Sequence, residues 1–136
     1  MIAIDVAGNA ATHTLAVGVD MSGPTIAVDT PADGQPLQSG EVTVVAQLFD
    51  GESGVSSAEA QLGGELSELT LDGTSATGSV VLPPDEGPVA LVVRAWSGVG
   101  VVAEVTHNLI VDNSPPSWET LTLGVLADGT AWITGP

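Results

Sequence analysis

The sequence contains no cysteine, so it can form neither a disulfide bond nor a thiolate metal site. Basic residues are almost as scarce. Arg94 stands against 17 Asp and Glu residues, and the formal net charge is −16. Such a surface repels nucleic-acid phosphates and anionic lipids, which argues against both as partners. It suits a high-salt medium or the binding of divalent cations.

Aromatic residues make up only 3% of the chain, and no apolar run approaches the roughly 18 residues that cross a bilayer. The first 20 residues also lack the charged start and the apolar core of a signal peptide. We therefore expect Met1 to be an initiator residue in front of a segment taken from a larger protein. The 136 residues are enough for one domain of ordinary size.

The abundant residues favour short strands joined by tight turns. Hydrophobic residues make up 43% of the chain, and 17 Gly and 9 Pro are spread among them. Apolar and polar residues alternate through most of the sequence, and no segment keeps a helical period. Strands separated by regular turn signals predict an all-β fold, an antiparallel β-sandwich. We expect seven strands, at residues 24–29, 41–49, 55–62, 66–71, 76–82, 88–96 and 101–111.

The alternation also predicts which side of a strand is buried. In PVALVVRAW, at 88–96, Val89, Leu91, Val93 and Ala95 share one face, which leaves Arg94 and Trp96 on the other. The same reasoning places Val42, Val44, Ala46 and Leu48 together on the core side of 41–49.

A sequence repeat divides the chain. THTLAVGVDMSGP (12–24) aligns with THNLIVDNSPP (106–116) with a two-residue gap, which sets Asp20 and Asp112 92 residues apart. Upstream, DVAGN (5–9) occupies the place of WSGVG (96–100), and downstream PADG (31–34) corresponds to LADG (126–129). A period near 90 residues in an all-β chain predicts tandem sandwich domains.

These stretches, with SGEVTVVAQLFDGESGVSSAEAQLGG and IVDNSPP, resemble the bacterial immunoglobulin-like and cadherin-like tandem repeats of large secreted or cell-surface proteins. The resemblance implies an immunoglobulin-like β-sandwich of about seven strands, with strand segments of flanking repeats at both ends. Residues 1–20 are then the C-terminal hairpin of a preceding repeat, 21–113 a complete repeat, and 114–136 the start of a following one. The sequence departs from the pattern at Trp96–Gly100, which lacks the Asp and the Asn of the first turn.

The boundaries between these units carry proline. Pro115 and Pro116 lack the amide hydrogen that a strand ladder needs, so we expect them to end the sheet and to hold the linker extended. Gly23 and Pro24 mark the corresponding place at the first boundary.

Acidic and amide side chains at the same boundaries are candidate calcium ligands. Asp112 and Asn113 offer hard oxygen atoms at a domain end, as Asp20 does at the first boundary. Asp50 and Glu52, in the DGESG turn, converge either there or at the opposite end of the domain. Calcium binds six to eight oxygens of this kind. The competing interpretation is that Asp and Asn occur here because they favour turns.

Three tryptophans leave a second question open. Trp96, Trp118 and Trp132 either pack at domain junctions or stack on a bound sugar. A catalytic role is disfavoured because the chain has one histidine per repeat and no paired nucleophile and base.

The sequence thus predicts a non-catalytic spacer of an extracellular adhesin or stalk, with calcium as its candidate cofactor. Its partners are neighbouring repeats of the same chain or of adjacent subunits. The alternatives are a filament subunit that assembles by strand addition of its terminal segments, and a carbohydrate-binding sandwich.

Overall fold

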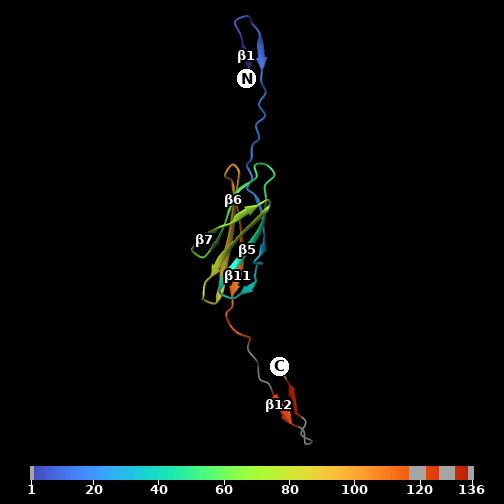
Figure 1. Ribbon diagram of the computed structural model, residues 1–136, viewed down its shortest axis with the longest axis vertical. Helices are drawn as coiled ribbons and strands as arrows, with labels where there is room; N and C mark the ends of the chain where they lie inside the picture. Colours follow the sequence, from blue (N-terminus) through green and yellow to red (C-terminus); the bar gives the residue numbers. More distant parts are fainter. Residues whose placement is uncertain (1, 117–121, 126–130, 135–136) are drawn as a thin grey trace.

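The computed structural model describes residues 2–116, 122–125 and 131–134. Its central part consists of two β-sheets packed face to face, with a separate two-stranded hairpin beyond each end (Figure 1). The described part of the chain contains no helix that could span a membrane.

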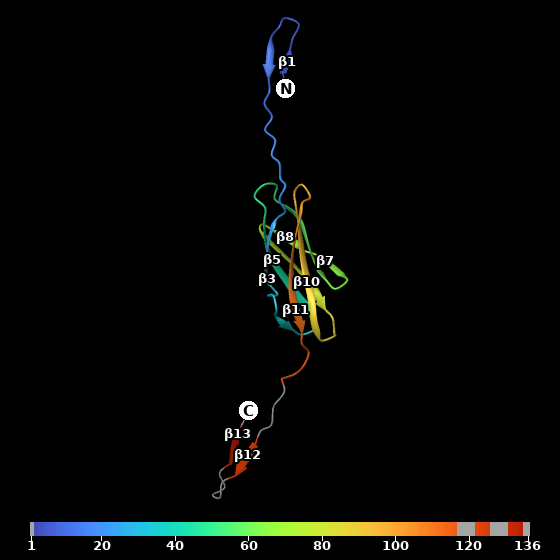
Figure 2. The same ribbon diagram turned by 180° about the vertical axis from the view of Figure 1, so that it is seen from behind.

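One sheet of the sandwich has five strands in the order β4-β11-β10-β6-β7. Its central pair, β10 and β11, is antiparallel and in continuous register, and the two run side by side in Figure 2. The strands are β4 (Pro36–Leu37), β11 (Val102–Val111), β10 (Gly87–Ser97), β6 (Val55–Leu62) and β7 (Glu65–Glu68).

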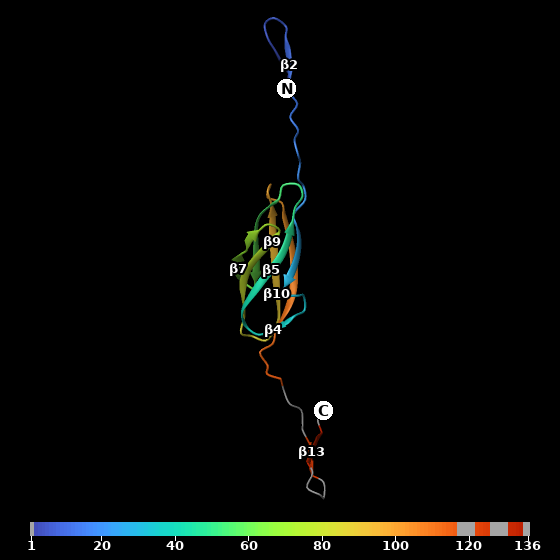
Figure 3. The same ribbon diagram turned by 45° about the vertical axis from the view of Figure 1, so that its right-hand side comes forward.

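The other sheet has four strands in the order β3-β5-β9-β8. All its pairs are antiparallel, and β5 with β9 forms its centre (Figure 3). The strands are β3 (Thr25–Thr30), β5 (Gly40–Phe49), β9 (Ser75–Leu82) and β8 (Thr70–Asp72). The expected all-β sandwich is therefore confirmed.

The core lies between the sheets, where the alternation predicted it. Val44, Ala46 and Leu48 of β5 are buried against residues of β10 and β11 in one apolar cluster. Small and branched side chains fill it, in keeping with the low aromatic content of the chain. The other buried members are Ala58, Ala60, Leu62, Leu69, Ala76, Val80, Leu82, Leu91, Val93, Ala95, Leu109 and Val111.

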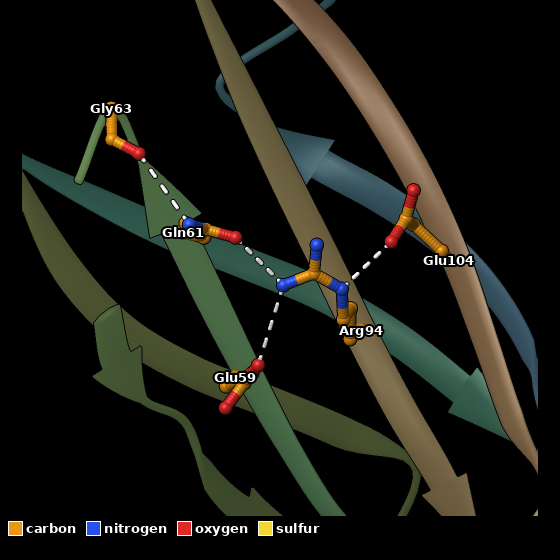
Figure 4. A network of polar contacts seen from close by, with 5 residues as sticks. All are labelled: Glu59, Gln61, Gly63, Arg94 and Glu104. Atoms are coloured by element: carbon orange, nitrogen blue, oxygen red, sulfur yellow. Dashed lines mark hydrogen bonds and ion pairs between the residues drawn. The ribbon is translucent and has the colours of Figure 1, made fainter. Parts of the chain in front are cut away.

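Arg94 lies on the outer face of the five-stranded sheet, as the alternation of 88–96 predicts. Its guanidinium group donates from Nε to Glu104 at 2.7 Å and from Nη1 to Gln61 at 2.7 Å (Figure 4). Glu59, on the same strand as Gln61, forms an ion pair with the same Nη1 at 3.5 Å. Strands β6, β10 and β11 are thereby joined across their exposed surface.

Two features of the sandwich differ from the predicted strands. The single strand expected at 66–71 is two strands in different sheets, because Leu69 between them turns into the core and donates its amide to Ala58 at 2.9 Å. Strand β4 was missed, since two residues are too few to show a period. Its proline sits at the sheet edge, where no ladder amide is required.

The terminal hairpins stand apart from the sandwich. Strand β1 (Ile2–Ile4) pairs with β2 (Ala10–Thr12), and β12 (Thr122–Val125) pairs with β13 (Ala131–Thr134). None of these strands pairs with a described strand of the sandwich. The two hairpins lie at opposite ends of the long axis (Figure 1), so the chain enters the sandwich at one end and leaves it at the other.

Candidate functional site

The candidate calcium ligands and the linker residues lie at the two ends of the sandwich. We call the N-terminal junction residues 18–24 together with the loop 50–54, and the C-terminal junction residues 112–116 with the loop that holds Pro84 and Glu86. The five candidate calcium ligands divide between them. Asp20, Asp50 and Glu52 meet at the N-terminal junction, and Asp112 and Asn113 lie at the C-terminal one.

At the N-terminal junction the Asp20 carboxylate bridges the linker and the sandwich. Its Oδ2 accepts a hydrogen bond from the Ser53 hydroxyl, and its Oδ1 accepts the Ser22 amide at 3.0 Å. These bonds, Ser53 first, lower the pKa of Asp20, and the Ser97 hydroxyl contributes in the same direction. The charged carboxylate is therefore the form that this site favours.

The loop that meets Asp20 is acidic. Asp50 Oδ1 accepts the amides of Glu52 and Ser53, each at 2.9 Å, while its Oδ2 is buried without a hydrogen-bond partner. A hydrogen bond to Asp20 and the negative charges of Asp20 and Asp50 raise the pKa of Glu52. A hollow of about 290 Å³ opens beside these groups, lined also by Gly18, Val19 and Val99.

The linker itself is seated closely on the sandwich. Pro24 is buried, and a Cβ added at Gly23 would lie 2.8 Å from the carbonyl oxygen of Val102. No real Cβ makes such an approach to backbone, so glycine is required for this contact. The pair Gly23–Pro24, predicted as a linker, therefore contacts the domain that follows it.

At the C-terminal junction, Asn113 is a structural tie. Its Oδ1 accepts the Ser39 amide at 2.8 Å, and its Nδ2 donates to the Pro84 carbonyl at 2.9 Å. The oxygen that was a candidate calcium ligand is thus already bonded. Asp112 makes a turn of its own, in which Oδ1 accepts the Ser114 amide at 3.0 Å. Pro115 and Pro116 follow in no strand, after β11 has ended at Val111.

No three acidic or histidine side chains of the described residues converge as a group that could hold a metal ion. The acids of the N-terminal junction come nearest in chemistry, because they bring carboxylates together with one unpartnered buried oxygen. Both Asp20 oxygens, however, are already bonded to Ser22 and Ser53.

The turn that sequence analysis aligned near residue 5 recurs in the sandwich with the same hydrogen bonds. Asp5 donates its amide to the Asn9 carbonyl at 2.9 Å, and Ser97 donates to Val101 at 2.8 Å. In both turns the fourth residue, Gly8 or Gly100, has a positive φ, 85° and 89° respectively. The alignment of DVAGN with WSGVG was wrong by one residue, since the matching turn is 97–101.

After this correction Ser97 stands where the first turn has Asp5, whereas Val101 stands where it has Asn9 and lacks that side-chain bond. The Ser97 hydroxyl accepts the Val101 amide at 3.2 Å, which is the place that the Asp5 carboxylate takes toward the Asn9 amide at 2.9 Å. A serine therefore does the work of the missing aspartate. Asp5 and Ser97 differ in identity, but each has a side-chain oxygen that can accept the amide four residues later. This shared property is the sequence signal that would have given the correct alignment.

The two hairpins also share their register. Ile4 pairs with Ala10 and Trp96 pairs with Val102, so that both partners are displaced by 92 residues between the hairpins. Their surroundings are opposite. Leu15 and Val17 are 75% and 74% exposed, whereas Leu109 and Val111, to which the sequence repeat aligns them, are 0% and 2% exposed.

Of the three tryptophans, only Trp96 has a described side chain. It is half-buried and lines a hollow of about 450 Å³ on the outer face of the five-stranded sheet, with Ser57, Glu59 and Glu68. Trp118 lies outside the described residues, and Trp132 belongs to β13. His107 donates a hydrogen bond from Nδ1 to the Pro31 carbonyl at 2.9 Å, which ties β11 to the end of β3.

No protein-family model matches the sequence, and no curated protein is significantly similar to it. Solved structures are similar. An engineered protein matches 65% of this chain at 21% identity with a TM-score of 0.54. The endo-β-1,4-mannanase from Thermotoga petrophila matches 70% at 17% identity with a TM-score of 0.58. A modular endo-β-1,4-mannanase from Cellulomonas fimi matches 65% at 23% identity with a TM-score of 0.50.

This chain covers 20%, 21% and 18% of those three structures, respectively. At such identities the likeness concerns the fold alone.

Proposed function

We propose that this chain is a non-enzymatic, immunoglobulin-like spacer segment of a repetitive extracellular bacterial protein, an adhesin or a stalk. Residues 21–113 are its complete repeat, and residues 1–20 and 114–136 belong to the repeats before and after. The strand orders β3-β5-β9-β8 and β4-β11-β10-β6-β7 support the immunoglobulin-like assignment, since two facing sheets of this size are typical of that fold. All their pairs are antiparallel except the short parallel pair of β4 and β11.

The observation that carries the proposal is the matched pair of hairpins. Hairpin β1–β2 has the register and turn of β10–β11, yet it has no sandwich around it. Its segment exposes apolar side chains whose counterparts are buried in the complete unit. Leu15 and Val17 are the two such side chains, and their exposure is unfavourable in an isolated chain. They are accounted for if a preceding repeat supplies the rest of the core.

The test is the mass of the chain in solution across a range of concentrations, for example by light scattering from about 10 to 500 μM. A spacer segment stays monomeric and elongated, with its hairpins at opposite ends. Growth of the mass with concentration would instead favour the filament subunit, in which the terminal segments pair with other molecules by strand addition.

Calcium at the junctions remains a prediction. A hydrogen bond with Asp20 and the negative charges of Asp20 and Asp50 raise the pKa of Glu52, and a divalent cation would relieve the repulsion among these carboxylates. Thermal melts with calcium and with a chelator test it on the wild type, Asp20→Ala and Asp112→Ala. If no melting midpoint depends on calcium, the prediction is wrong at both junctions.

A second candidate, glycan binding, is favoured by the hollow at Trp96. An aromatic ring beside a hydroxyl and two carboxylates has the chemistry of a site for a neutral sugar. The test is tryptophan fluorescence against a panel of neutral oligosaccharides, in a Trp118→Phe, Trp132→Phe background. Quenching that disappears in Trp96→Phe would support it, and a flat response across the panel would exclude it.

A further inference from the structure

The loop that receives Asp20 is held in place by its own contacts. Gly54 accepts the Gly98 amide at 2.8 Å, which fastens the loop to the β10–β11 turn. A Cβ at Gly98 would lie only 2.4 Å from the Ser53 carbonyl oxygen, so the Ser53 backbone rests directly on that glycine. Together with the two amides bonded to Asp50, these contacts hold the Ser53 backbone in place, so that its side chain is presented to the linker.

The carboxylate that fits this loop comes from a turn of the form Asp-x-Ser. Asp20-Met21-Ser22 closes through the bond from the Ser22 amide to Asp20 Oδ1 at 3.0 Å. That bond leaves Oδ2 directed to Ser53. Gly23 then lies against Val102, and Pro24 is buried, so the chain enters the sandwich along one path.

The opposite end of the sandwich presents the same turn. Asp112-Asn113-Ser114 closes through the Ser114 amide and Asp112 Oδ1, also at 3.0 Å. Its backbone is anchored by the Asp112 amide, which donates to the Leu37 carbonyl at 2.9 Å. Asn113 and the contact between Ser114 Oγ and Glu86 at 2.8 Å hold the rest of the turn. No hydrogen bond to Asp112 Oδ2 is found among the described residues.

We infer that the two ends of the sandwich are complementary docking surfaces for like repeats. The Asp-x-Ser turn at the C-terminal end of one repeat seats its aspartate on the serine of the 50–54 loop at the N-terminal end of the next. The partner of Asp112 is thus the corresponding loop of a following repeat in the same chain. The inference deepens the proposed spacer function and rests on it, because it assigns the direction in which successive repeats are joined.

The physical consequence is a junction that resists bending. An extended linker of five or so residues samples many directions when nothing holds it. A charge-assisted hydrogen bond to a fixed hydroxyl, with glycine and proline packed on the domain, removes most of that freedom. The repeats then project along one axis, as the two hairpins do in Figure 1.

The test uses the full chain and the backbone amide dynamics of residues 19–23, measured by 15N relaxation. In the wild type we expect order parameters of about 0.85 there, as in rigid backbone, and values below about 0.6 in Asp20→Ala and in Ser53→Ala. Glu41→Ala, which removes an exposed acid of β5 away from the junction, is the matched control. The amides of the sandwich report that each variant is folded.

A second pair of variants separates packing from the hydrogen bond. Gly23→Ala is expected to loosen the same amides, because its Cβ meets the Val102 carbonyl, whereas Gly18→Ala has open space and should leave them unchanged. The inference is overturned if Asp20→Ala and Ser53→Ala keep wild-type order parameters, or if the wild type is already mobile at 19–23. Mass measured on the same samples tests the spacer function separately, since assembly with concentration would overturn that function while leaving the docking result readable.

Discussion

At the scale of single residues, Gly78 is fixed by one close contact in the core. A Cβ added there would lie 2.6 Å from Leu69 Cδ2, a side chain that is itself buried. We predict that Gly78→Ala lowers the free energy of unfolding by about 1–3 kcal/mol, because Leu69 has to leave its position between the sheets. Chemical denaturation measures this, with Gly64→Ala, where a Cβ meets nothing within 4 Å, as the control. Equal stabilities of the two variants would contradict the steric argument.

The sequence predicts which faces of the strands are buried, but it does not predict close contacts such as that between Gly78 and Leu69. Alternation in 41–49 and 88–96 depends only on the period of a strand, so the core sides were predictable from the sequence. Which glycine faces a backbone atom of a distant strand depends on how two segments are brought together. The spacing of Gly78 from Leu69, or of Gly98 from Ser53, carries no periodic signal of that kind.

At the scale of elements, the acidic loop 50–54 makes stability depend on pH. The raised pKa of Glu52 means that the folded chain keeps this proton to a higher pH than the unfolded chain does. Below about pH 4, near the ordinary Glu pKa, both states are protonated and the repulsion vanishes. As the pH rises through the folded pKa, the charged Glu52 destabilises the fold. We predict that Glu52→Gln melts above the wild type at pH 7 and that the gap closes toward pH 3.

Asp20 gives the opposite sign in the same experiment. Its pKa is lowered in the fold, so its contribution to stability is present at neutral pH and is lost as the pH falls through that lowered pKa. Asp20→Asn should therefore melt below the wild type at pH 7, and its gap should also narrow in acid. For Glu52→Gln, a difference in melting midpoint from the wild type that stays constant from pH 3 to pH 8 would show that the charge of Glu52 is not the cause of that difference.

The C-terminal junction gives an element-scale prediction for Asn113. The side chain ties the chain after β11 to Ser39 and to Pro84, one bond from each end of its amide. We predict that Asn113→Ala lowers the free energy of unfolding by about 1–2 kcal/mol, since two hydrogen bonds are lost near the sandwich edge. Urea unfolding measures it. Asn113→Asp keeps the acceptor for Ser39 but sets a carboxylate oxygen against the Pro84 carbonyl, so it should lose at least as much at pH 7. Wild-type stability in Asn113→Asp would contradict this assignment.

The predicted metal ligands show where sequence reasoning about elements stops. Five oxygen-bearing side chains were recognised at the boundaries, and three of them do meet at one junction. The sequence placed Asp50 and Glu52 at either end, because a turn between two strands can lie at either pole of a sandwich. The Asn113 side-chain oxygen accepts a hydrogen bond from Ser39, 74 residues away in the chain. No feature of the sequence predicts that contact.

At the scale of the whole molecule, the arrangement follows from a repeat that the sequence does show. The spacing of 92 residues between Asp20 and Asp112 predicted a hairpin before the sandwich, and β1–β2 occurs there. The two strands that follow the sandwich pair differently from the two strands that begin it. Strands β3 and β4 pair with β5 and β11, whereas β12 pairs with β13. Among the described residues, β12 and β13 pair only with each other, which agrees with the proposal that 114–136 begins a further repeat.

The proposed spacer function and the proposed docking of repeats lead together to one prediction about a longer chain. Residues 1–114 joined directly to residues 23–136 place Ser114 before Gly23, as Ser22 is in the natural sequence, and keep Asn113 in both copies. If the unit of the array is right, this chain contains two complete sandwiches. We expect it to be monomeric and to melt at the wild-type midpoint, because each copy keeps its whole core. Small-angle X-ray scattering should show a rod whose greatest dimension grows by about one sandwich length.

The internal Asp112 then has the Ser53 of the second copy within reach, which the single repeat does not offer it. Asp112→Ala at that junction should shorten the average greatest dimension by letting the rod bend, and should lower the melting midpoint in the same direction as Asp20→Asn does in the single repeat. The same substitution in the second copy, where no complete repeat follows, is the control and should leave the dimension unaltered. A rod of equal length in all three chains would mean that the linker backbone alone sets the direction. A chain that melts well below the wild type would mean that 92 residues are not the folding unit, because its cores would then be incomplete.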